Sequence, residues 1–150
     1  MSTPTADELI EAVRALPAGR GFLAPPASPQ ALDALAAGLG RPLPADLRAL
    51  LLRSDGIGVA ASTGFYLESV AGLRRLAGDD LYMSAFPGAL LVGDDGASGL
   101  YLVDRDGRVL LTDRGSLLSR DTVVTGESVS DVLAAVLEGT DLWTRPRLGT

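Results

Sequence analysis

The sequence predicts an α+β domain with N-terminal helices, a central antiparallel sheet of about four to six strands with two successive hairpins, and a C-terminal helix. Apolar residues recur at helical spacing through the first third of the chain and again over residues 128–138. Between these segments lie short apolar runs separated by turns rich in glycine and aspartate. Helical and extended segments do not alternate, which favours this class over a parallel doubly wound sheet.

The first expected helix covers residues 5–16. Thr5 is its N-cap and Glu8 stands three residues on, which is the spacing of a capping box. A proline-rich connector over 23–29 separates this helix from the next. The apolar stripe of the first helix is formed by Leu9, Ile10, Val13 and Leu16.

Two more helices are expected before the sheet begins. The second covers 29–39, where Ser28 can cap the helix and Pro29 suits the first helical position. The third covers 44–54 and stops at the breaker Asp55-Gly56. The first third of the chain is therefore expected to be helical.

The first strand signal lies over residues 63–68. Phe65 and Leu67 alternate with Tyr66 and Glu68, the pattern of a half-buried strand. A brief helical turn is expected over 70–76.

Three apolar runs, over 89–93, 100–103 and 109–112, then predict two successive antiparallel hairpins. Their loops cover 94–99 and 105–108. In the second loop the Asp-Gly pair favours a two-residue turn.

That turn would pair Leu102 with Leu111 and Tyr101 with Thr112. The face expected to meet the helices then consists of Leu100, Leu102, Val109 and Leu111, and the opposite, amphipathic face of Tyr101, Val103, Leu110 and Thr112.

The chain ends with one more strand over 121–125 and a helix over 128–138. The tail over 143–150 is expected to be ordered only if Leu142 and Trp143 dock on the domain. The buried stripe of the last helix is formed by Val129, Val132, Leu133, Val136 and Leu137.

The composition removes most routes to catalysis. The 150 residues include no cysteine, histidine, lysine or asparagine, and all 13 basic residues are arginine. Without cysteine there is no disulfide, zinc-thiolate site or thiolate nucleophile. Without histidine and lysine there is no ordinary general base near neutral pH and no Schiff-base amine. We therefore expect a protein that is not an enzyme and needs no cofactor.

Charge and hydropathy limit the partners and the compartment. The net charge of −6 argues against nucleic acid and suits a basic partner, although an acidic balance also serves solubility alone. No apolar run approaches the roughly 20 residues of a membrane span. Asp7 and Glu8 stand where a signal peptide carries a basic segment, so a cytoplasmic location is expected.

Residues 56–61, Gly-Ile-Gly-Val-Ala-Ala, match the dinucleotide pattern G-x-G-x-x-A. That pattern needs a strand before it and a helix after it. Here a helix ends at the first glycine, so we interpret these glycines as a loop and expect no nucleotide.

A set of aspartates lies in the predicted hairpins: Asp94, Asp95, Asp104, Asp106 and Asp113. Carboxylates of this kind can hold Mg²⁺ or Ca²⁺. Aspartate is also favoured in turns because its side chain accepts hydrogen bonds from nearby amides. The turn interpretation is preferred, and no metal ligand is assigned.

Tyr66, Glu68 and Tyr101 are predicted to point away from the main core. Exposed tyrosine beside acid is typical of recognition surfaces. With the neighbouring Asp94 and Asp95 they form the expected partner-binding residues. The alternative is that loops or the N-terminal helix cover the rings.

Two segments resemble the SUKH superfamily, the SMI/KNR-type domain. The first runs Leu-Gly-Arg-Pro-Leu-Pro-Ala-Asp-Leu-Arg-Ala-Leu-Leu over 39–51 and on to Asp55-Gly56. The second runs over 91–96, Leu-Val-Gly-Asp-Asp-Gly, and continues through 99–104 and 107–109. The resemblance spans about 29–138. It implies one SUKH-like domain over 1–150, with residues 1–28 as an N-terminal helix and connector.

Bacterial members of this superfamily are largely immunity proteins, each of which neutralises a toxin, often a nuclease. The resemblance therefore implies a protein that binds and occludes a toxin. Members of the family share no catalytic residues, so none is assigned here. A fungal relative acts as a scaffold in cell-wall regulation, so a housekeeping interaction module is the alternative. A metal-dependent hydrolase using the aspartates is a third. The chain departs from the family at Ala36 or Ala37 and at Ala97-Ser98, which puts the subfamily in doubt.

Overall fold

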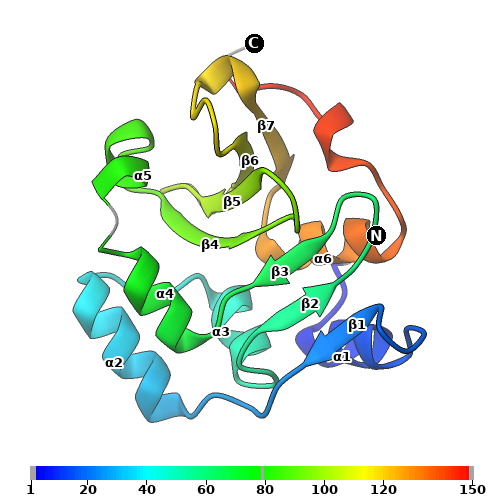
Figure 1. The fold of residues 1–150 in the computed structure, drawn as a ribbon. Coiled ribbons are helices and arrows are strands. Elements are labelled where there is room, and N and C mark those ends of the chain that lie inside the picture. Colours follow the sequence, from blue (N-terminus) through cyan, green and yellow to red (C-terminus); the bar gives the residue numbers. More distant parts are fainter. Residues whose placement is uncertain (1–2, 79, 149–150) are drawn as a thin grey trace.

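The computed structural model describes residues 3–78 and 80–148. One antiparallel sheet has its strands in the same order as the chain (Figure 1). The predicted α+β class is confirmed, with seven strands where about four to six were expected. The strands are β1 Gly21–Leu23, β2 Ile57–Val59, β3 Phe65–Leu67, β4 Leu90–Asp94, β5 Gly99–Val103, β6 Val109–Asp113 and β7 Thr122–Gly126.

Helices precede, interrupt and follow the strands. They are α1 Ala6–Arg14, α2 Pro29–Leu39, α3 Ala45–Leu51, α4 Val70–Leu76, α5 Asp80–Ala85 and α6 Val129–Leu137, with short 3₁₀ turns η1 Ser119–Asp121 and η2 Leu142–Thr144. Figure 1 shows α5 apart from the other helices, beside β4 and β5.

Local capping chemistry sets where the helices begin. Thr5 and Glu8 form the predicted capping box of α1. Ser28 accepts a hydrogen bond from the amide of Ala31 at the start of α2. Ser128 caps α6 in the same way. Each such side chain contributes about 1 kcal/mol by satisfying an amide that the helix itself leaves unpaired.

The sheet has an apolar core on each face. The inner face packs against the buried stripes of α1, α2, α3, α4 and α6. The outer face carries a smaller cluster under α5 and the C-terminal segment, formed by Phe86, Ala89, Leu91, Leu100, Leu102 and Leu110.

The register of the β5–β6 hairpin differs by one residue from the prediction. Tyr101 pairs with Leu111 and not with Thr112. The strands are joined through residues 105–107, and Gly107 at the end of this loop has a φ of 86°. Three-residue loops with glycine in the left-handed region are a standard alternative to the two-residue turn.

The shift reverses the faces of β5, because side chains alternate along a strand. Tyr101 and Val103 lie in the inner core, whereas Leu100 and Leu102 lie in the outer cluster. The prediction was wrong for these four. It was right for β6, where Val109 and Leu111 face the helices and Leu110 faces away.

Asp104 explains the longer loop. Its Oδ1 accepts hydrogen bonds from the amides of Asp106 at 2.9 Å and Arg108 at 3.0 Å, and its Oδ2 accepts one from Arg108 Nε at 2.9 Å. These bonds need Asp104 opposite Arg108, the pairing that the three-residue loop provides.

Three elements were not predicted. β1 ends at Leu23, the first residue of the expected connector, and α5 lies in a segment given no structure. Of the glycines interpreted as a loop, Gly56 does lie in the loop before β2, whereas Gly58 lies within β2, so the interpretation was wrong for Gly58. β1 is Gly-Phe-Leu and β2 is Ile-Gly-Val, so neither shows the alternation of large apolar and polar side chains by which the equally short β3 was predicted.

The C-terminal segment docks on the domain as far as it is described. Leu142 is fully buried, and Trp143 Nε1 donates to Asp95 Oδ2 at 3.3 Å. Arg147 forms a bridge with Val123 of β7. Residues 149–150 of the expected tail lie outside the described residues. Among the described helices, none is long and apolar enough to cross a membrane.

Candidate functional site

The structure brings two of the expected partner-binding residues side by side. Tyr66 of β3 pairs with Asp94 of β4, and both side chains are partly exposed. Glu68 follows two positions after Tyr66 and so points to the same outer face. These three residues share one surface: the alternation with Phe65 and Leu67 predicted it for Tyr66 and Glu68, and the β3–β4 pairing adds Asp94.

Tyr101 does not belong to that surface. Its side chain is fully buried, and its ring meets that of Phe65 edge-on at 5.1 Å. The hydroxyl donates to the carbonyl of Gly64 at 2.7 Å. Burial raises the pKa of Tyr101 above its ordinary value, and the negative charges of Asp95 and Asp94 raise it further. The prediction that Tyr101 points away from the main core was wrong, because it depended on the shifted register.

Asp94 and Asp95 act on their own loop. Asp94 Oδ1 accepts from the amide of Gly96 at 2.8 Å. Asp95 Oδ1 accepts from the amides of Ala97 and Gly99, both at 2.9 Å. Because its other oxygen is taken by Trp143, Asp95 holds the loop and the C-terminal segment together.

The remaining hairpin aspartates do not assemble a metal site. Asp104 holds the β5–β6 loop, and Asp113 accepts from the amide of Gly115 at 2.7 Å. Among residues 3–78 and 80–148, no group of three or more His, Cys, Asp or Glu is placed to hold a metal ion. These contacts support the turn interpretation.

Sequence reasoning missed one residue of the outer surface, Phe22. It pairs with Gly58 of β2, which in turn pairs with Tyr66, so the three lie in one row across the sheet. Phe22 is 51% exposed, and among the residues whose burial is described Leu118 is the one other large apolar side chain in the exposed class. What places Phe22 here is the pairing of β1 with β2, and no structure was predicted for residues 17–22.

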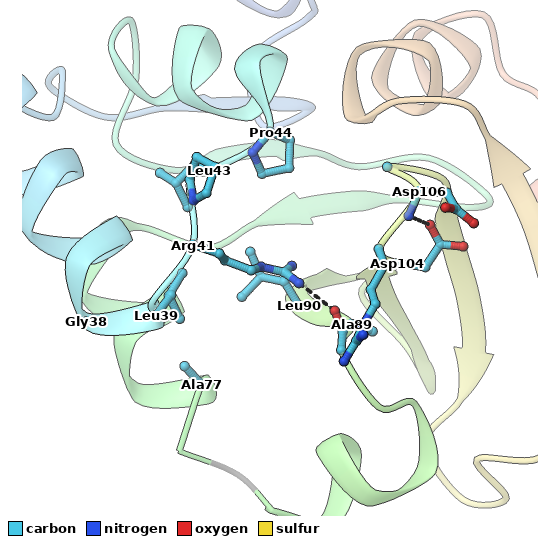
Figure 2. A pocket seen from close by; sticks show the side chains of 14 residues that line it. Gly38, Leu39, Arg41, Leu43, Pro44, Ala77, Ala89, Leu90, Asp104 and Asp106 are labelled. Carbon is cyan, nitrogen blue, oxygen red and sulfur yellow. Dashed lines mark hydrogen bonds between the residues drawn. The ribbon is translucent and has the colours of Figure 1, made fainter.

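Another hollow lies between the α2–α3 loop and the β5–β6 loop. It has a volume of about 820 Å³. Figure 2 shows Arg41 reaching across it to the carbonyl of Gly88, with a hydrogen bond of 2.5 Å. Asp104 and Asp106 lie on its opposite side, on the β5–β6 loop.

This hollow is the meeting place of the two segments that carry the family resemblance. Residues 38–44 line one wall and residues 104–107 the other. A model of the SMI1/KNR4 family (SUKH-1) matches residues 26–134. The chain belongs to the SMI1/KNR4 family. A search among curated proteins finds no match for this SUKH-1 chain.

The motif residues of this SUKH-1 domain have structural partners. Asp46 of the first motif accepts from the amide of Ser130 at 2.8 Å, at the start of α6. Asp55 accepts from the amide of Val70 at 2.8 Å, at the start of α4. The aspartates therefore satisfy helix starts and turns that the fold needs. The match runs from α2 into α6 and leaves out α1, β1 and η2.

Proposed function

We propose that this SUKH-1 protein is an immunity protein, which neutralises a cognate toxin by binding it and covering its working surface. The observation that carries the proposal is the family match over residues 26–134. Bacterial members of the superfamily are largely immunity proteins of this kind. We place its action in the cytoplasm and assign the whole of 1–150 to one domain.

The chemistry of the chain favours binding over catalysis. There is no histidine, cysteine or lysine to act as base or nucleophile. The hairpin aspartates Asp94, Asp95, Asp104 and Asp113 are engaged in turn hydrogen bonds. The proposal therefore gives the protein no reaction of its own.

The net charge of −6 supports a basic partner such as the cleft of a nuclease. Opposite charges steer the two proteins together and speed association, and salt screens the effect. We expect association to slow by about tenfold or more between low and high salt, because steering of this kind falls steeply with ionic strength.

The test is co-expression with the product of the adjacent reading frame. Growth arrest by that product, relieved by this protein and accompanied by a complex on pull-down, is the expected result. A housekeeping interaction module would give a complex from cell lysate but no growth relief. Failure of both rescue and complex formation would sink the immunity proposal.

A further inference from the structure

The outer face of the sheet carries a trough above β2. The outward positions of this strand and its lead-in are glycines, Gly58 and Gly56, which place no side chains between β1 and β3. The resulting hollow has a volume of about 320 Å³ and is lined by Phe22, Tyr66 and Glu68 among others.

Aromatic rings flank Gly58. A Cβ at that position would lie 3.0 Å from Phe22 Cδ2 and 3.1 Å from Tyr66 Cδ1, so both rings lean over the glycine backbone. Tyr66 also lies against Gly64 and Gly96. Phe22 is 51% exposed and Tyr66 is partly exposed. The two rings therefore form an aromatic surface on either side of Gly58 that solvent reaches.

Glu68 supplies negative charge to the lining of the hollow, and its side chain is 29% exposed. Its cationic neighbour is Arg75, 3.9 Å away and itself 73% exposed, a separation at the edge of an ion pair. Asp94 lies beside Tyr66 on the neighbouring strand.

We propose that this trough receives an arginine or lysine side chain of the protein partner. The cation lies over the faces of Phe22 and Tyr66 and pairs with Glu68, taking the place that Arg75 occupies loosely. Aromatic faces attract cations, and a partly buried carboxylate adds a charge-assisted hydrogen bond. The net charge of −6 complements such a partner. This inference rests on the proposed function only in requiring a protein partner.

The first test uses a defined probe, the blocked peptide acetyl-Gly-Arg-Gly-amide, titrated into ¹⁵N-labelled protein by NMR. We expect saturable shifts at the amides of Gly56, Gly58 and Tyr66, and weaker binding of the matched glutamine peptide. Phe22→Ala and Glu68→Gln should each weaken binding of the arginine peptide about three- to tenfold. Leu118→Ala, which truncates the other exposed apolar side chain, and Glu138→Gln should leave it unchanged.

Equal shifts with both peptides, or full binding by Glu68→Gln, would overturn the proposal. A second arm separates it from the immunity function. Suppose that the wild type relieves the growth arrest caused by the adjacent gene product, and that the double variant Phe22→Ala/Glu68→Gln binds this toxin equally well. The proposed cation site is then wrong, while the immunity function is supported. If the wild type does not relieve the growth arrest but the arginine peptide still binds the trough saturably, the immunity function is wrong and the cation site is supported.

Discussion

The hydroxyl of Tyr101 is a polar group inside the inner core, with the carbonyl of Gly64 as its partner. Tyr101→Phe removes the donor and leaves that carbonyl without its bond. We expect a loss of about 1–2 kcal/mol in the free energy of unfolding, measured by urea denaturation. Tyr66→Phe, at a partly exposed ring, is the matched control and should change stability by less than about 0.5 kcal/mol. Equal losses would contradict the buried bond.

The same tyrosine predicts how stability changes at alkaline pH. Burial and the charges of Asp95 and Asp94 raise its pKa in the folded state, while the unfolded value is the ordinary 10.0. Above about pH 10 the unfolded chain loses this proton and the folded chain keeps it, so the unfolded state binds fewer protons and stability falls as pH rises.

From this group alone the fall approaches about 1.4 kcal/mol per pH unit. Urea denaturation at pH values from 9 upward, compared with Tyr101→Phe, measures it. The wild-type advantage over the variant should shrink with rising pH. A constant difference would show that Tyr101 ionises normally in the folded protein.

The motif aspartates give a second residue-scale prediction. Asp55→Ala removes the acceptor for the amide of Val70 at the start of α4. We expect about 1–2 kcal/mol of destabilisation, because a capping side chain is lost. Asp33→Ala, which removes a mostly exposed carboxylate paired with Arg48, should cost no more than about 0.5–1 kcal/mol. Equal effects would mean that Asp55 has no capping role.

At the scale of elements, two glycines should respond in opposite directions to alanine. Gly107 has a φ of 86° at the end of the β5–β6 loop, where a Cβ is strained. Gly38 lies inside α2 with open space around it and no positive φ. Thermal unfolding should show Gly107→Ala less stable by about 1 kcal/mol and Gly38→Ala more stable by about 0.5–1 kcal/mol. The same sign at both positions would contradict the assigned loop.

How far the sequence predicts these elements depends on how local their causes are. The capping residues Thr5, Ser28 and Ser128 are read directly from the chain, so α1, α2 and α6 were predicted within a few residues. The register of β5 was not predicted correctly, because an Asp-Gly pair fits both a two-residue and a three-residue loop. The side chain of Asp104 decides between them, and that needs a structure.

The candidate site was predicted in part for the same reason. Tyr66 and Glu68 follow from alternation within β3. Phe22 joins them only through the pairing of β1 with β2, two strands separated by more than thirty residues of helix and loop. Contacts of that range leave no periodic signal in the sequence.

At the scale of the molecule, the SUKH-1 fold provides a rigid sheet with helices on its inner face and an acidic balance overall. The outer face is covered near β4 and β5 by α5 and the C-terminal segment. Beyond this cover, near β1 to β3, the exposed ring of Phe22 stands beside Tyr66. The protein therefore combines the scaffold of its family with a local surface suited to the basic partner proposed above.

The central claim is that this protein works by binding a toxin. It is tested most directly by titrating the purified protein into the purified product of the adjacent reading frame and following heat, with growth relief measured in parallel. We expect a saturable complex whose formation abolishes the toxin's activity and whose association slows as salt is raised. A toxin that stays fully active at saturating concentrations of this protein, with no heat of binding, would contradict it.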